Sequence, residues 1–193
     1  MLIQRLKDSD GLRYAYAMMN DYLKYCDVVP YDEFRYFAQY FSKLREGEDY
    51  MVYRAIENDV TLGVCTMVLL NEFVLIESFI VPSDHRDRTN EVLENVLSVA
   101  KEFKRPIIAE VKDKKFCTKL RHLFGFEWFD QAYECIILKD DTISVYFSNL
   151  LYLNESTMDF EKTKHTLYER YYYWWKKTYY DKLLNDYKNH LML

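Results

Sequence analysis

The stretch Ile80–Leu97, IVPSDHRDRTNEVLENVL, joins an apolar strand to an amphipathic helix through a loop that is rich in charge. A strand, a polar loop and a helix N-terminus in this order build phosphate-binding sites in many folds, because the free amides at a helix start attract anions. The loop has no glycine between Ser83 and Glu91, and it also carries Asp84 and Asp87. The order of elements therefore predicts an anion site, whereas the residues within the loop oppose one.

The pattern of apolar residues around this stretch predicts an α+β fold of the order β-α-α-β-β-β-α-β-α-β-β, with helices on both faces of a mixed sheet. Residues 51–70 are typical of a hairpin with Asn58-Asp59 in its turn, and Gly125 is typical of the position just after a helix end. The expected strands are 2–6, the two halves of 51–70, 73–81, 107–111 and one or two within 128–138, and the expected helices are 8–26, 30–44, about 90–100 and 114–124.

A chain of 193 residues suits one domain, or one domain with an appendage. We expect a domain over residues 1–140 and a Tyr- and Trp-rich helical extension over 141–193. Residues 141–160 fit neither a helix nor a strand pattern clearly. From Asp159 onward there is neither Gly nor Pro, which favours one long helix over 160–192.

Aromatic residues occur around nearly all of this expected helix, and Tyr, Trp and Arg are enriched in protein interfaces. Contact with a partner protein or a second copy of the chain is therefore favoured. Packing on its own domain and stacking on single-stranded nucleic acid stay open as alternatives.

The composition excludes several classes of protein. A net charge of −5 argues against a general nucleic-acid binder. The four cysteines are scattered without a CxxC pair, so we expect reduced thiols and no metal site. No apolar run is long enough to cross a membrane, and the N-terminal residues lack the apolar core of a signal peptide. We therefore expect no membrane contact and a cytoplasmic location. The many Tyr, Lys and Asn residues also suit an AT-rich genome such as that of many phages, for which the location would be the host cytoplasm or the virion.

The element order over residues 1–140 resembles the GNAT superfamily of N-acetyltransferases, most densely between Val74 and Phe126. In that family a strand ending in V-x-P precedes a loop R/Q-x-x-G-x-G/A, whose amides hold the pyrophosphate of acetyl-CoA. Val81 and Pro82 fit the strand end, although no residue separates them. The best register for the loop motif starts at Arg88. The resemblance assigns the cofactor loop to Val81, Arg86, Arg88, Thr89, Asn90 and Glu91.

The glycine positions of this motif are filled by other residues. In the register from Arg88 they are Glu91 and Leu93, and in the register from Arg86 they are Thr89 and Glu91. A carboxylate about 5 Å from a phosphate costs on the order of 3 kcal/mol at an effective dielectric of 20, which is about a hundredfold in affinity. The loop is therefore expected to be vestigial, with acetyl-CoA bound only if the protein is active.

The sequence also departs from the second family motif, N-x-x-A-x-x-x-Y-x-x-x-G-F. Aligned on Gly125-Phe126, Lys114 takes the place of the Asn that contacts the cofactor, and Cys117 that of the Ala. Arg121 replaces the Tyr that often serves as general acid, and arginine cannot release a proton near neutral pH. Glu77 is the candidate base, since some family members carry a catalytic carboxylate in this strand.

Two other groups of residues suggest chemistry only weakly. Asp84-His85 with Asp87 is typical of a solvated turn more than of metal ligands, because adjacent loop residues rarely converge on one ion. Cys117 and His122 lie five residues apart, which indicates a core thiol and a surface imidazole more than a nucleophile and its base.

Two functions follow from these patterns. The favoured one is an acetyltransferase-fold protein that is catalytically reduced and acts by binding another protein, for instance as a phage virion or assembly component. The alternative is an active N-acetyltransferase that uses acetyl-CoA through an altered pyrophosphate loop, with Glu77 as base.

Overall fold

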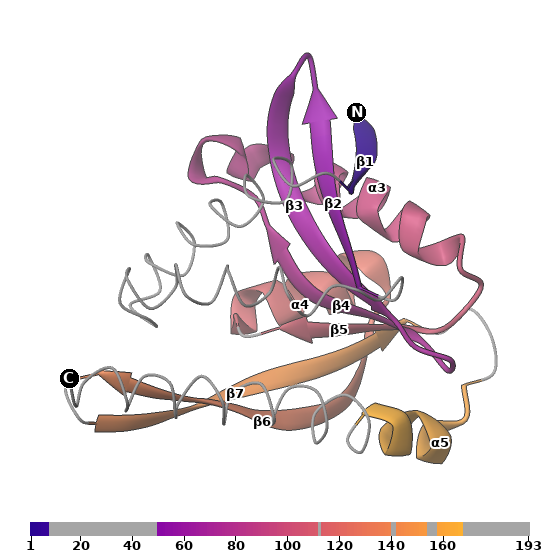
Figure 1. Ribbon diagram of the computed structural model, residues 1–193, viewed down its shortest axis with the longest axis vertical. Coiled ribbons are helices and arrows are strands. Elements are labelled where there is room, and N and C mark those ends of the chain that lie inside the picture. Colours follow the sequence, from indigo (N-terminus) through magenta and orange to yellow (C-terminus); the bar gives the residue numbers. More distant parts are fainter. Residues whose placement is uncertain (8–49, 112, 140–141, 154–157, 168–193) are drawn as a thin grey trace.

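A seven-stranded mixed sheet forms the framework of the protein, with helices on both of its faces (Figure 1). The computed structural model describes residues 1–7, 50–111, 113–139, 142–153 and 158–167. The predicted α+β class and element order are confirmed within these ranges. The helices expected over 8–26 and 30–44 lie outside the described residues.

The strands in the order β1-β2-β3-β4-β5-β7-β6 are antiparallel to their neighbours except for the parallel pair β4 and β5. The strands are β1 Leu2–Leu6, β2 Tyr50–Glu57, β3 Val60–Leu69, β4 Val74–Ile80, β5 Ile107–Val111, β6 Glu127–Lys139 and β7 Thr142–Leu153. The helices are the 3-10 helix η1 Ser83–Arg88, α3 Thr89–Lys101, α4 Lys114–Phe124 and α5 Phe160–His165.

The β2–β3 hairpin turns at Asn58 and Asp59, as predicted. Both residues have positive φ, 50° and 64°. A two-residue turn with positive φ at both positions matches the right-handed twist of the flanking strands, and Asn and Asp tolerate this region better than most residues.

Helix α3 crosses from β4 to its parallel neighbour β5 and lies directly on β3 at Gly63. A β-carbon on Gly63 would lie 3.0 Å from the carbonyl oxygen of Ile80 and 3.0 Å from Cγ1 of Val92. The helix is in contact with the sheet here because position 63 has no side chain. Its apolar face is buried in the core, as its spacing predicts. The residues of this face are Val92, Leu93, Val96, Leu97 and Ala100.

Helix α4 has well-defined ends that its sequence explains. The side chain of Asp113 accepts hydrogen bonds from the amides of Lys115 and Phe116, which caps the first turn. Gly125 follows the last turn in the left-handed conformation, with φ of 71°, and Phe126 N donates to the carbonyl of Leu120. The predicted end of this helix at Gly125 is confirmed.

The sheet continues past the expected domain boundary at 140. Residues 128–138 belong to the single strand β6, and the last strand is β7, within the segment 141–160 that showed no clear pattern. β7 lies between β5 and β6 and pairs with both. The final pair of strands therefore uses more of the chain than the sequence indicated.

The first turns of the expected helix 160–192 pack on the face of the sheet opposite α3 and α4. Leu167 is fully buried in a cluster with Phe129 and Leu150, and the rings of Phe129 and Phe160 stack at 5.9 Å. Thr166 Oγ1 also donates to Glu72 Oε2 at 2.8 Å. This start of the extension packs on its own domain, and residues 168–193 lie outside the described part.

We predict that Gly63→Ala lowers the free energy of unfolding by about 1–3 kcal/mol, because the added methyl group pushes Val92 of α3 and Ile80 of β4 away from β3. Urea unfolding monitored by circular dichroism measures the change. Gly125→Asn is the matched control, since no atom lies within 4 Å of its β-carbon position and Asn tolerates positive φ. Equal stability of Gly63→Ala and the wild type would contradict the close packing of α3 on β3.

Candidate functional site

The parallel strands β4 and β5 pair only over their first residues and then separate. Val74, Leu75 and Ile76 pair with Ile107, Ile108 and Ala109, and no pair follows, although β4 continues to Ile80 and β5 to Val111. The two strands diverge toward the end of the sheet where η1 begins (Figure 1). The expected cofactor loop and the expected base thus lie at the open end of this pair.

A β-bulge marks the point of separation. Thr66 on β3 faces Ser78 while Met67 faces Ile76, so Glu77 is the extra residue on β4. The buried hydroxyl of Thr66 donates to Glu77 Oε2 at 3.3 Å and lies 2.6 Å from Ser78 Oγ. The candidate base Glu77 is half-buried and lies at a bulge, a feature that redirects a side chain and is common beside active sites.

The loop between β4 and α3 is a 3-10 helix that uses its own amides. His85 N donates to the carbonyl of Pro82 at 3.0 Å. The amide of Thr89, the first residue of α3, donates to the carbonyl of Arg86, and the Thr89 hydroxyl donates to the same oxygen at 2.7 Å. Because an amide that bonds to a loop carbonyl does not also point at a ligand, these two amides are not available to a phosphate group.

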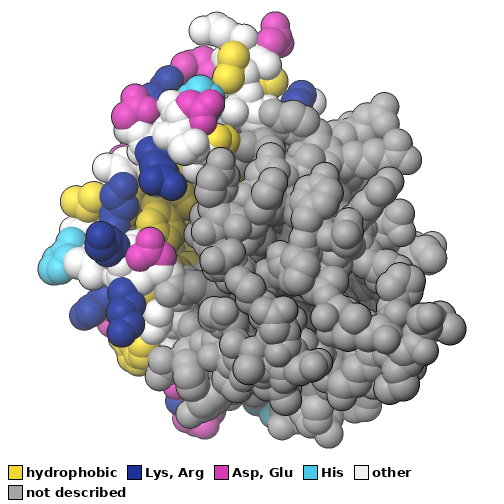
Figure 2. Space-filling model, turned by 90° about the vertical axis from the view of Figure 1, so that its left-hand side faces the viewer, with side chains coloured by type: hydrophobic (Ala, Val, Ile, Leu, Met, Phe, Trp, Pro, Cys, Tyr) yellow, Lys and Arg dark blue, Asp and Glu magenta, His cyan; other side chains and the backbone are white. Residues whose placement is uncertain are grey.

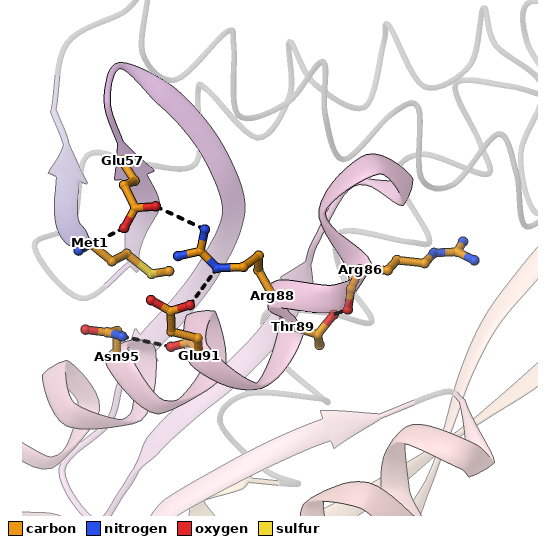
Figure 3. Close-up of polar contacts among 7 residues, drawn as sticks. All are labelled: Met1, Glu57, Arg86, Arg88, Thr89, Glu91 and Asn95. Carbon is orange, nitrogen blue, oxygen red and sulfur yellow. Dashed lines mark hydrogen bonds and ion pairs between the residues drawn. The ribbon is translucent and has the colours of Figure 1, made fainter.

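Arg88, the arginine that best matches the family motif, lies between two carboxylates. Its Nη1 is 3.0 Å from Glu57 Oε2 on β2, and its Nε is 2.6 Å from Glu91 Oε2 in the first turn of α3. Figure 3 shows the guanidinium between these two side chains, with the amino group of Met1 on the far side of Glu57 at 3.4 Å. The charge of Arg88 is therefore balanced inside the protein.

This pairing shifts the protonation equilibria of all three side chains. The hydrogen bond from Arg88 is the largest cause that lowers the pKa of Glu91 below its ordinary value of 4.5, and it also lowers the pKa of Glu57. The same two hydrogen bonds, first that of Glu91, raise the pKa of Arg88. At neutral pH the group holds two carboxylates against two cations, Arg88 and the amino group of Met1, so it offers no net positive charge to an anion at the start of α3.

The other residues of the expected loop are scattered. Arg86 and Asn90 are exposed, and the side chain of Arg86 points away from Arg88 (Figure 3). Val81 is half-buried and packs against the core. Leu93, at the second glycine position, is a core residue of α3 that is 2% exposed. Among the expected loop residues, the structure joins the side chains of Arg88 and Glu91 and adds Glu57 to them, while Thr89 bonds to the backbone of Arg86. The residues present do not fit a pyrophosphate held by loop amides.

Helix α4 beside the open end carries no acid at the tyrosine position. Arg121 and His122 are exposed, while Cys117 is buried, and burial raises the pKa of its thiol. The interpretation of Cys117 and His122 as a core thiol and a surface imidazole is confirmed. The ring of Phe116, in the first turn of α4, stacks on Phe79 of β4 at 5.6 Å with an interplanar angle of 6°. An aromatic pair therefore connects α4 to the separated part of β4.

The Asp84-His85-Asp87 group forms part of η1, with both aspartates exposed. Ser83 Oγ donates to Asp84, which is consistent with a solvated turn. Within the described ranges, no three His, Cys, Asp or Glu residues gather as a metal-binding group. In the same ranges, no helix has the length and apolar character needed to span a membrane.

Sequence reasoning missed Glu57 and Thr66. Glu57 lies 31 positions before Arg88 and ends a strand of the hairpin, where an acidic residue is unremarkable. Thr66 reaches Glu77 only because the bulge brings it into register. Neither residue has a local signal, since both contacts depend on how distant strands pair.

Known proteins are similar to this chain in structure more than in sequence. No protein-family model matches the sequence, and no curated protein matches it. Solved structures do. A GNAT-family protein from Bacteroides thetaiotaomicron is 19% identical and has a TM-score of 0.61, covering 88% of this chain and 97% of that one. The chain has the GNAT acetyltransferase fold.

Two further structures with the GNAT fold are similar to the chain. The ribosomal-protein-S18-alanine N-acetyltransferase from Escherichia coli is 15% identical, with a TM-score of 0.58 over 81% of this chain and 94% of that one. The Campylobacter jejuni N-acetyltransferase PseH, solved with acetyl coenzyme A, is 16% identical, with a TM-score of 0.52 over 80% and 100%. At these identities the GNAT likeness establishes the fold and not the activity.

We predict that Arg88→Met raises the pKa of Glu91 toward 4.5, because the hydrogen bond that stabilises its carboxylate is lost. A carboxylate whose pKa is lowered by folding stabilises the protein above its unfolded pKa, and this contribution disappears as the pH falls through the folded pKa. The wild type should therefore lose more stability than Arg88→Met between pH 7 and about pH 3.

Carbon-13 NMR titration of the glutamate side chains measures these pKa values, and urea unfolding at the two pH values measures the stability. Glu94, an exposed glutamate on the outer side of α3, is the internal control. Identical titration of Glu91 in both proteins would show that Arg88 does not pair with it in solution.

Proposed function

We propose that the protein is a catalytically reduced acetyltransferase-fold protein that acts by binding another protein. The observation that carries this proposal is the Glu57–Arg88–Glu91 group. It places two carboxylates around the loop arginine at the start of α3, the position where the GNAT resemblance expects a pyrophosphate.

Three further features support the proposal. The amides of His85 and Thr89 are bonded within the loop. Arg121 stands at the position of the proton-donating tyrosine and is exposed. The partner-binding part of the proposal rests on the Tyr- and Trp-rich segment 168–193, whose composition is that of an interface. A role in a phage virion or its assembly, in the host cytoplasm or the particle, is one form that this function takes.

The alternative is an active N-acetyltransferase with an altered loop, and one observation favours it. Glu77 is held by Thr66 at a bulge where β4 leaves β5, so a carboxylate is positioned at the open end of the strand pair. A half-buried carboxylate with a fixed orientation suits a general base. This alternative requires acetyl-CoA to bind through contacts other than the loop amides.

Calorimetric titration of acetyl-CoA and CoA into the full chain distinguishes the catalytically reduced protein from the active enzyme. We predict no binding tighter than about 50 μM, because a bound pyrophosphate would have to displace Glu91 from Arg88. In the double variant Glu57→Gln/Glu91→Gln, which releases Arg88, affinity should rise at least about tenfold.

The control is Glu94→Gln, which removes one negative charge from the exposed side of the same helix and should leave affinity unchanged. Binding by the wild type tighter than about 50 μM that is lost in Arg88→Ala would overturn the proposal and favour the active enzyme.

A further inference from the structure

We propose that the outer face of α4 is the docking surface for an acidic segment of the partner protein. This inference rests on the proposed function, because it names the class of partner and the place where that partner binds.

Positively charged residues dominate this face. Four residues of α4 are Lys or Arg and a fifth is His, and all except the half-buried Lys119 are exposed. They are Lys114, Lys115, Lys119, Arg121 and His122. Figure 2 shows Lys and Arg side chains gathered over the described part of the face that α4 shares with η1.

These cations are not used for internal pairing. Among the described residues, none of the five forms an ion pair with a carboxylate. Two lysines of α5, by contrast, pair with carboxylates, Lys162 with Glu72 and Lys164 with Asp130. The nearest acid along the chain, Asp113, caps the backbone of α4 instead. In a chain of net charge −5, such a set of unpaired cations calls for an external partner.

Helix stability accounts for Arg121, which lies in the last turn where a cation complements the helix dipole, but not for the two lysines at the other end of α4. Lys114 and Lys115 occupy the first turn of α4, which contains no acidic residue. A cation at this end opposes the helix dipole and costs about 0.3–1 kcal/mol. Residues that break a local stability rule without a compensating internal contact are candidates for function.

The spacing of the cations fits a polymer better than a small anion. From Lys114 to His122 the helix rises roughly 12 Å, whereas the cations around one phosphate group converge on a single point. Lys115, Lys119 and Leu123 also fall on one line at i, i+4 and i+8. Leu123 is 61% exposed, so this line ends in an apolar contact. A segment with acidic residues followed by an apolar one complements it.

A polypeptide fits this surface better than a nucleic acid. Single-stranded nucleic acid is bound by stacking its bases on exposed aromatic rings, and the exposed apolar residue on this helix is a leucine. The overall negative charge of the chain also repels a densely charged phosphate backbone more than a segment with a few carboxylates.

Fluorescence anisotropy with a labelled peptide of about 15 residues, built from Glu-Glu-Leu repeats, tests the inference on the full chain. We expect binding that weakens as salt is added, because exposed charges are screened. Lys115→Glu/Arg121→Glu should weaken it at least about tenfold, and Leu123→Ala about threefold. The control Lys7→Glu/Lys104→Glu makes the same charge change at exposed lysines away from α4 and should weaken it less than about twofold.

Thermal unfolding confirms that each variant is folded before it is compared. Equal weakening by the α4 variant and its control would overturn the inference, since net charge alone would then explain binding. Tighter binding of an oligothymidine with the same number of charges would overturn it in favour of nucleic acid.

Experiments with CoA distinguish a failure of this inference from a failure of the proposed function. Failure of the peptide to bind, together with no CoA binding by calorimetry, removes the docking surface and leaves the reduced site in place. Displacement of the peptide by CoA in the micromolar range overturns both, because α4 would then hold the phosphates of the cofactor.

Discussion

In the described sheet, β4 and β5 run parallel, and this pairing sets the path of the chain around the candidate site. Two adjacent parallel strands require a crossover connection, and here α3 supplies it by packing on β3 at Gly63. The same pairing ends after Ile76, so the loop before α3, the bulge at Glu77 and the first turn of α4 all lie around one open end of the sheet. The residues of the candidate site therefore gather at that end.

In the proposed function, internal contacts at this end take the place of a bound cofactor. In the family that this chain resembles, the loop offers free amides and an arginine to an anion. In this chain the amides of His85 and Thr89 bond to loop carbonyls, and Arg88 is balanced by Glu57 and Glu91. Each contact is modest by itself because the side chains are partly exposed, but together they leave no unbalanced positive charge at the start of α3. The lysines and the arginine of α4 form no ion pair among the described residues.

Local features of the sequence predicted most of the described fold. The hairpin turn at Asn58-Asp59, the apolar face of α3 and the cap at Gly125 each depend on a few neighbouring residues, and all three are confirmed. β7 was not recognised, because Ser144, Ser148 and Asn149 interrupt its apolar pattern and its neighbours β5 and β6 come from elsewhere in the chain.

The residues of the candidate site were likewise predicted only where their contacts are local in sequence. The sequence indicated that Glu91 and Arg88 share the start of α3, because they are three residues apart on one helix turn. It could not place Glu57 or Thr66, because strand register and a bulge decide which distant side chains meet.

The position of β7 has a consequence for how the chain is made. β5 is synthesised with one neighbour, β4, and its second neighbour follows only after α4 and β6 have been added. Until Leu153 has left the ribosome, the buried strand IIAEV presents an unpaired apolar edge, and β6 has no strand to join. The central sheet is therefore completed from its middle, late in synthesis, and the nascent chain depends on rapid closure by β7 to avoid pairing with other chains.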